Sequence, residues 1–334
     1  MRSLARLGLL LACFAGWLTA KDLQVYFIDV EGGQSTLFVA PSGESLLMDV
    51  GWGGFNHRDG NRIAAAAKAA GVKKIDYLVI SHYHADHAGG ILDVAGKFSI
   101  RNFVDHGDTT ETGQDAKVLF NEYTSVRAKG DHILVKPGDV IPIKGLEVHV
   151  LAAGGETLAA PLTGAGEANP SCATYQAPQD EPASENQRSI GLLISYGSFR
   201  ILDLGDLTTT REHDLVCPAN KIGTVDVFVS SHHMGEMANT PQLLQAIRPK
   251  VAIGNNGARK GGEAWETIHG TPGLMDIWQL HYALANGKDH NSPDTFIANV
   301  DEACQGKWLR LTVDKDGSYT IFNSRNRYEK AYSR

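Results

Sequence analysis

The sequence lacks several patterns that define common classes of protein. It has no run of Lys or Arg, and its 31 basic residues are outnumbered by 38 Asp and Glu, for a formal net charge of −7. Because affinity for long nucleic acids depends on basic side chains that neutralise phosphates, this balance disfavours such a partner. There is no C-x-x-C pair for a cysteine-based zinc finger and no G-x-S-x-G elbow for a serine nucleophile. After residue 20 we find no internal repeat and no stretch long enough to span a membrane.

The first 20 residues have the composition of a secretory signal peptide. Arg2 and Arg6 precede an unbroken apolar stretch over 7–18, and the small residue Ala20 follows. An uncleaved anchor is the alternative. Cleavage would leave residues 21–334 as a secreted or periplasmic chain with three cysteines, Cys172, Cys217 and Cys304. An exported protein with this count can form one disulfide and keep one thiol, and any pairing is possible.

Strand-like and helical runs alternate along the rest of the chain without a clear linker, which predicts one layered α/β domain. The segment 153–188 is rich in Gly, Ala, Pro and Glu and is interpreted as a long loop near the functional site, a lid or an insertion. We predict strands at 23–30, 35–40, 45–50, 75–80, 146–152, 189–197, 199–206, 225–231 and 250–255, helices at 61–72, 89–96, 120–129, 241–249 and 274–286, and a hairpin over 307–323.

The segment SHYHADHAGG (81–90) crowds three imidazoles and a carboxylate directly after the apolar run IDYLVI. His82 and His84 are two residues apart in an extended segment, so both can face the same ion. Asp86 and His87 follow where the chain turns into a helix, and they are placed to hold a second ion. Imidazole and carboxylate ligands favour Zn²⁺, and Mn²⁺ or Fe²⁺ is also possible.

Two further strand ends supply ligands of the same kind. The run LDLGD ends at Asp206, and SSHHMG places His232 and His233 after another apolar run. A carboxylate between two cations can bridge them at about 3.5–4 Å, as two-metal hydrolases require. Alone, Asp206 would be interpreted as a turn residue or a helix cap, but with the 81–90 segment it predicts one joint metal centre.

These motifs together resemble the metallo-β-lactamase superfamily. The resemblance rests on His82-x-His84-x-Asp86-His87, the distal Asp206 and the late His232-His233. It implies an αββα sandwich with two metal ions at one edge. The stretches FIDVEGGQSTLFVAPSGESLLMDVG, ENQRSIGLLISYGSFRILDLGDL and DVFVSSHHMGE resemble more specifically the ComEC-like branch, which is related to a DNA-uptake competence protein and includes secreted hydrolases.

One departure from the superfamily pattern concerns the third histidine of the first metal. No His occurs between His149 and His213, and Asn186 stands near the expected position, as in the ComEC-like branch. An amide oxygen is a weak zinc ligand, so this site is predicted to bind loosely or to take a water.

Several residues outside the motifs have a role implied by the resemblance. Asp49 would orient a histidine of the 82–87 loop, although a turn carboxylate is an equal alternative on sequence alone. His269 falls where the branch has a loop histidine near the substrate. His106, His281 and His290 are interpreted as structural or surface residues.

The predicted function is an exported hydrolase that uses a metal-bound hydroxide, hydrogen-bonded to Asp86 or Asp206, as the nucleophile. The resemblance favours a phosphodiester, and the acidic charge favours a small molecule over long DNA. A lactone, a β-lactam or another carbonyl substrate is the alternative. A non-catalytic metal-binding scaffold is the alternative of another class.

Overall fold

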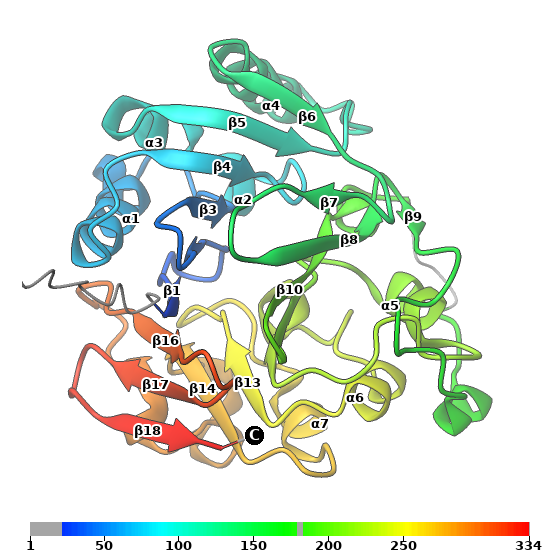
Figure 1. Ribbon diagram of the computed structural model, residues 1–334. Helices are drawn as coiled ribbons and strands as arrows, with labels where there is room; N and C mark the ends of the chain where they lie inside the picture. The colour runs from blue at the N-terminus through cyan, green and yellow to red at the C-terminus, as the bar shows by residue number, and fades with distance from the viewer. Residues whose placement is uncertain (1–21, 179–182, 334) are drawn as a thin grey trace, which may run out of the picture.

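Two sheets stacked face to face form the centre of the protein (Figure 1). The structure is a computed structural model and describes residues 22–178 and 183–333. The first sheet has the strand order β18-β17-β16-β1-β2-β3-β4-β5-β6. Its strands are β1 (Leu23–Phe27), β2 (Thr36–Val39), β3 (Ser45–Met48), β4 (Ile75–Val79), β5 (Ile100–Asp105), β6 (Asp131–Leu134), β16 (Leu309–Val313), β17 (Tyr319–Asn323) and β18 (Glu329–Tyr332).

The second sheet has the order β15-β14-β13-β12-β11-β10-β8-β7, and β9 pairs with β8. Its strands are β7 (Val140–Ile141), β8 (Glu147–Ala153), β9 (Glu156–Thr157), β10 (Gly191–Tyr196), β11 (Phe199–Asp203), β12 (Val227–Val229), β13 (Val251–Gly254), β14 (Asp276–His281) and β15 (Ile297–Asn299).

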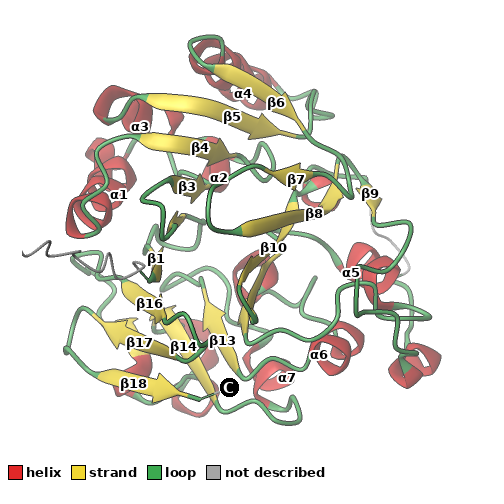
Figure 2. Ribbon diagram, in the orientation of Figure 1, coloured by secondary structure: helices red, strands yellow, loops and turns green. Residues whose placement is uncertain are grey.

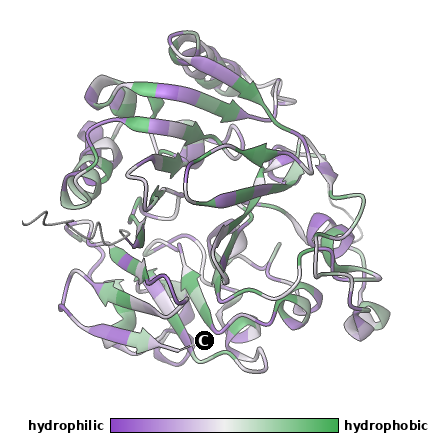
Figure 3. Ribbon diagram, in the orientation of Figure 1, coloured by the Kyte–Doolittle hydropathy of each residue, from purple (hydrophilic) through white to green (hydrophobic). Residues whose placement is uncertain are grey.

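Helices cover the outer face of each sheet, as Figure 2 shows. An apolar core between the sheets is built from both sets of strands, and a further apolar cluster lies under the helices on each side. Figure 3 shows the strands as the most hydrophobic segments. The first sheet carries α1 (Arg58–Ala69), α3 (Ile91–Lys97) and α4 (Gln114–Arg127), and the second carries α5 (Thr209–Val216), α6 (Pro241–Ile247) and α7 (Trp265–His269). The fold is therefore the predicted αββα sandwich.

Strand direction positions the functional loops. The strands β3 to β6 run parallel in the first sheet, and β11 to β15 run parallel in the second. The carboxyl ends of parallel strands meet at one edge of a sheet, where open α/β sheets place their ligands. The loops after β4, β11 and β12, which contain the predicted ligands, all leave from such ends.

Most of the predicted elements are confirmed, and one is wrong. The segment 274–286, predicted as a helix, contains the strand β14 (Asp276–His281). From Ile277 to His281 every residue is buried, because this strand lies between two parallel neighbours and under α7. A strand buried on both faces loses the alternation of polar and apolar residues that separates it from a helix.

The described part of the segment 153–188 has little regular structure. It contains β9, the 3₁₀ turn Pro170–Thr174 and the turn Asn186–Arg188. A disulfide joins Cys172 to Cys217 at the end of α5, and Cys304 is a free thiol. The predicted signal peptide lies outside the described residues. Within those residues, no helix combines the length and the apolar character of a membrane span.

Candidate metal centre

Four buried side chains bring their ligand atoms together where the two sheets meet. One atom each from Asp86, His87, Asp206 and His233 lies within 4.8 Å of the others. The Nε2 atoms of His87 and His233 are 3.3 Å apart. His87 Nε2 is 3.2 Å from Asp206 Oδ1, and His233 Nε2 is 3.0 Å from Asp86 Oδ2. Loops after three different strands, β4, β11 and β12, therefore converge on one point.

The chain after β4 gives the loop its shape. His84 is extended (φ −76°, ψ 154°), and the short helix α2 (Ala85–Ala88) then turns Asp86 and His87 back toward the strand ends. Gly33 permits this turn to pack closely, because a Cβ at that position would lie 2.3 Å from the carbonyl oxygen of Asp86. The amide of Gln34 donates a hydrogen bond to the same oxygen at 3.1 Å. The backbone of the ligand loop is thus held by the loop after β1.

Asp206 occupies the middle of the cluster. Its Oδ2 is 3.2 Å from His233 Nε2, 3.8 Å from His232 Nε2 and 4.0 Å from His82 Nε2. Burial alone would raise the pKa of Asp206, but the imidazoles of His233 and His87 hold it well below its usual value. This carboxylate therefore faces two groups of histidines.

The second group of histidines lies beside the first. His82 Nε2 is 3.0 Å from His84 Nδ1, so both ring nitrogens point toward the same region. His232 Nε2 is 3.4 Å from the amide nitrogen of Asn186, the residue at the expected position of the third histidine. The structure thus places His232 beside Asn186 and His233 in the four-residue cluster.

The backbone of the turn Ser231–Met234 allows the two adjacent histidines to diverge. His232 (φ 49°) and His233 (φ 57°) both adopt the left-handed conformation, which is costly for residues other than glycine. Their ring centroids are 5.9 Å apart. A strained backbone of this kind is kept only where surrounding contacts hold it in place. Here the buried carboxylate of Asp206 contacts both rings.

Asp49, at the end of β3, fixes the orientation of His87. The Nδ1–H of His87 donates to Asp49 Oδ2 at 2.7 Å, which leaves Nε2 free to face the cluster. Asp49 is itself held by the amide of Ser81 at 2.7 Å and by the Ser81 hydroxyl at 2.6 Å. Histidines that ligate metals commonly donate their other N–H to such a carboxylate.

Sequence analysis missed Lys260, which lies at the mouth of the cluster. Its ammonium forms an ion pair with Asp86 Oδ2 and lies 5.0 Å from the centre of the Trp52 ring. The loop reaches this place because Gly261 (φ 79°) packs against His233, where a Cβ would lie 1.9 Å from the carbonyl oxygen. The glycines of GARKGG (257–262), one residue after the predicted strand KVAIGN, were the available signal.

His269 lies elsewhere. It ends α7, is exposed, and stacks on Trp265 with ring centroids 4.5 Å apart. It does not line either of the two cavities that border the metal centre. The place of His269 in the structure gives it no contact that would support the role of a substrate ligand.

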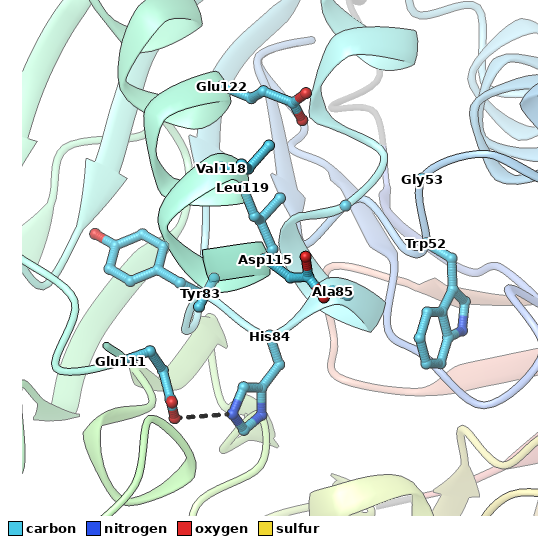
Figure 4. A pocket seen from close by; sticks show the side chains of 12 residues that line it. Trp52, Gly53, Tyr83, His84, Ala85, Glu111, Asp115, Val118, Leu119 and Glu122 are labelled. Atoms are coloured by element: carbon cyan, nitrogen blue, oxygen red, sulfur yellow. Dashed lines mark ion pairs between the residues drawn. The ribbon is translucent and has the colours of Figure 1, made fainter. Parts of the chain in front are cut away.

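A cavity of about 470 Å³ opens next to His84 (Figure 4). Trp52 lies on one side of it and α4 on the other, with Val118 and Leu119 as apolar lining. Three carboxylates also line it, Glu111, Asp115 and Glu122, and the lining includes no Lys or Arg. The Nε2 of His84 is 3.6 Å from Glu111 Oε1.

The donor set fits divalent cations. Buried carboxylates and imidazoles whose nitrogens face one another at 3.3 Å leave lone pairs that a proton or a cation must satisfy. Asp206 Oδ1 is buried without a hydrogen-bond partner. Lys260 is the only ammonium or guanidinium group in the described part of the chain that pairs with Asp86 or Asp206. Nitrogen and oxygen ligands of this kind suit Zn²⁺, and also Mn²⁺ and Fe²⁺.

Comparison with known protein families finds a match in the part of the sequence that contains the motif at 82–87. Residues 29–166 match the model of the metallo-beta-lactamase superfamily. No curated protein sequence matches the chain.

Three solved structures illustrate the similar folds. The metallo-beta-lactamase fold protein YhfI from Bacillus subtilis is 13% identical, with 78% of this chain and 96% of that chain covered and a TM-score of 0.47. A diphosphatase of the PhnP family is 14% identical, with 76% and 94% covered and a TM-score of 0.41. CmlA, a diiron beta-hydroxylase from Streptomyces venezuelae, is 16% identical, with 76% and 47% covered and a TM-score of 0.44.

This chain spans about half the length of CmlA. The residues that match the metallo-beta-lactamase superfamily model, 29–166, include the motif at 82–87.

Proposed function

We propose that this chain is an exported, metal-dependent hydrolase of the ComEC-like branch and that it cleaves a small phosphodiester. The observation that carries the proposal is the convergence of Asp86, His87, Asp206 and His233 from three strand ends. Two buried carboxylates that face two imidazoles need protons on the imidazoles or a bound cation to balance their charge, and a single divalent cation supplies that charge.

Two cations, most suitably Zn²⁺, would be held by different residues. The first would be held by His82, His84 and Asp206, with His232 in place of the missing third histidine. The second would be held by Asp86, His87, His233 and Asp206. When bound, such ions lower the pKa of a coordinated water to about 7 and polarise the bond that is cleaved.

The remaining side chains bind and orient the substrate. Lys260 lies at the mouth of the centre and would pair with a negative charge on the substrate once a cation neutralises Asp86. Asp49 keeps His87 in the tautomer that presents Nε2. The cavity beside His84 would take the rest of the substrate, with Trp52 as an aromatic wall.

The cavity also supports a small substrate over a long polyanion. Glu111, Asp115 and Glu122 face the same space, and they would repel the successive phosphates of a nucleic acid. One phosphodiester group at the metal centre would lie next to Lys260 instead. The acidic net charge of −7 acts in the same direction.

The direct test is hydrolysis of a nitrophenyl phosphodiester by zinc-loaded protein, with chelated protein as the control and a lactone and a β-lactam assayed in parallel. We expect zinc-dependent turnover of the phosphodiester. Turnover of a carbonyl substrate alone would refute the phosphodiester as the substrate class, but it would support the proposal that the protein is a hydrolase. The absence of all turnover from protein with measured metal would refute the hydrolase and favour a metal-binding scaffold.

Export has a separate test. We expect the protein recovered from the periplasm or the medium of a bacterial host to begin at Lys21, as determined by N-terminal sequencing. Protein that stays in the membrane with residues 1–20 attached would contradict cleavage and favour an anchor.

A further inference from the structure

A second group of ligand-type side chains lies between β1 and β14, and the proposed hydrolysis does not use it. Asp29 and Glu31 follow β1, His281 ends β14, and Cys304 lies in the loop between β15 and β16. One ligand atom from each of the four lies within 4.8 Å of the others. Sequence analysis interpreted His281 as a structural or surface residue and Cys304 as one of three possible disulfide partners.

The separations of these atoms are close to those around one metal ion. Cys304 Sγ is 3.1 Å from Asp29 Oδ2 and 3.1 Å from Glu31 Oε1. His281 Nε2 is 3.7 Å from Glu31 Oε2. Tetrahedral zinc with bonds of about 2.0–2.3 Å places its ligand atoms roughly 3.3–3.7 Å apart. A small adjustment of side chains would therefore complete a Cys-His-carboxylate site.

His281 gives an independent indication of a missing partner. Its side chain is 1% exposed, and its Nε2 is buried without a hydrogen-bond partner. The other nitrogen, Nδ1, lies 3.3 Å from the carbonyl oxygen of Tyr282 and donates its hydrogen there. Nε2 then carries a lone pair directed toward the Glu31 carboxylate, which is repulsive unless a cation lies between them. Histidine ligands of metals commonly use one nitrogen in this way and donate the other N–H to an oxygen.

The charges of the cluster also leave room for a divalent ion. Arg62 Nη1 lies 3.0 Å from Asp29 Oδ2, and Arg62 Nη2 lies 3.1 Å from Glu31 Oε1. One guanidinium against two carboxylates leaves one negative charge. The thiol of Cys304 carries a proton that it shares between Asp29 Oδ2 and Glu31 Oε1 when no cation is bound. Binding of a divalent cation, with release of that proton to solvent, would bring the cluster to neutrality.

We propose that Asp29, Glu31, His281 and Cys304 form a further metal site for a borderline divalent cation such as Zn²⁺, separate from the centre at 82–87. Thiolate, imidazole and carboxylate are the ligands that zinc accepts together. The site would be structural, because its four protein ligands fill a tetrahedral shell and leave no position for a substrate.

This cluster lies next to the loop that supports the metal centre, so a cation bound here would also affect that centre. Glu31 is two residues before Gly33, which packs on the carbonyl of Asp86, and three before Gln34, which donates to it. A cation bound by Glu31 would therefore hold the loop that supports the ligand loop. The proposal does not depend on the hydrolase activity, because it concerns metal binding alone.

The test uses the full chain loaded with Co²⁺, whose bond to a thiolate gives an absorption band in the near ultraviolet. We expect this band in the wild type and its loss in Cys304→Ser, together with the loss of one bound ion per chain in native mass spectrometry. The full chain has one further cysteine outside the disulfide, Cys13 in the first 20 residues. A band that is lost in Cys304→Ser comes from Cys304 and not from Cys13. Asp206→Asn should keep the band, because it changes only the other centre.

A second pair of variants keeps the test decisive if Cys304→Ser folds poorly. His281→Gln preserves much of the volume and should weaken the affinity for cobalt at this site by about tenfold or more. His290→Gln, at an exposed histidine, should not change it. A wild type that fills the centre at 82–87 and shows no thiolate band would refute the proposal, and Arg62, Asp29 and Glu31 would then be an ion-pair network alone. Equal cobalt affinity in His281→Gln and His290→Gln would refute the role of His281.

Discussion

The two clusters at the strand ends use similar ligand types but are assembled differently. The proposed metal centre would take four of its ligands from the six residues 82–87, whereas the Cys304 cluster draws its four residues from positions 29 to 304. In the centre, Asp86 is paired with the flexible Lys260, and in the Cys304 cluster, both carboxylates are paired with Arg62. Lysine holds a single mobile charge, whereas arginine holds two carboxylates in a fixed geometry.

This difference indicates which cluster can exchange the positive group bound to its carboxylates for a cation or a substrate. A lysine over an open cavity can move from Asp86 to a substrate when a cation arrives. A guanidinium with 10% side-chain exposure that bridges two carboxylates stays where it is. We therefore assign chemistry to the centre and support to the Cys304 cluster.

The largest effect is expected from Asp206→Asn. Asp206 faces both groups of histidines, so its loss should remove a ligand from two ions at once. Hydrolysis should fall by at least about 10²–10³-fold, the cost of losing a single electrostatic contribution to a transition state. Metal content and kcat should be measured together.

The matched control is Asp203→Asn, three residues earlier and equally buried, which hydrogen-bonds to Gln34 and not to the histidines. Wild-type metal content and activity in Asp206→Asn would show that this carboxylate does not bridge the two ions.

His232→Ala should separate the two halves of the centre. If His232 replaces the third histidine, the variant should bind one metal ion fewer, while the ion held by His87 and His233 stays. The count is obtained from native mass spectrometry of zinc-loaded protein. An unchanged count would contradict the assignment of His232 and leave Asn186 as the nearest candidate.

Asp49→Asn should weaken metal affinity by about 10–100-fold, because the N–H of His87 would lose its charged acceptor. Competition with a chromogenic chelator measures the change. The acceptor of the histidine N–H differs in the Cys304 cluster. There His281 donates to a backbone carbonyl, which no side-chain substitution removes. Metal affinity equal to the wild type would show that Ser81 alone orients the loop.

Lys260→Ala should lower kcat/KM for an anionic substrate by about tenfold, a typical cost of a charge-assisted contact. Its effect on a neutral substrate should be smaller. Arg259→Ala is the matched control, because this neighbour is exposed and pairs with Glu302. Equal losses in the two variants would contradict a specific role for Lys260.

Glu111→Gln should have the smallest effect, about twofold on metal affinity. The carboxylate of Glu111 is 3.6 Å from His84 Nε2, and both side chains are about one third exposed, so solvent screens the pair. A loss of metal affinity as large as that in Asp49→Asn would show that the solvent exposure of Glu111 does not make its contribution smaller than that of the buried Asp49.

The same comparison explains what sequence analysis could and could not find. The ligand loop was predictable because its residues are adjacent in the chain and follow an apolar strand. Lys260 and His281 were not identified, because each reaches its cluster through the packing of segments distant in sequence. The strand β14 was mistaken for a helix because complete burial removes its alternation. The disulfide between Cys172 and Cys217 required the three-dimensional structure.

Anomalous diffraction at the zinc edge, from crystals of zinc-loaded protein, tests the account most directly. The account predicts one strong peak among Asp86, His87, Asp206 and His233, a second among His82, His84 and His232, and a third at Cys304. The absence of any peak at Asp206, in crystals grown from protein with measured zinc, would contradict the central claim that these strand ends form a metal centre.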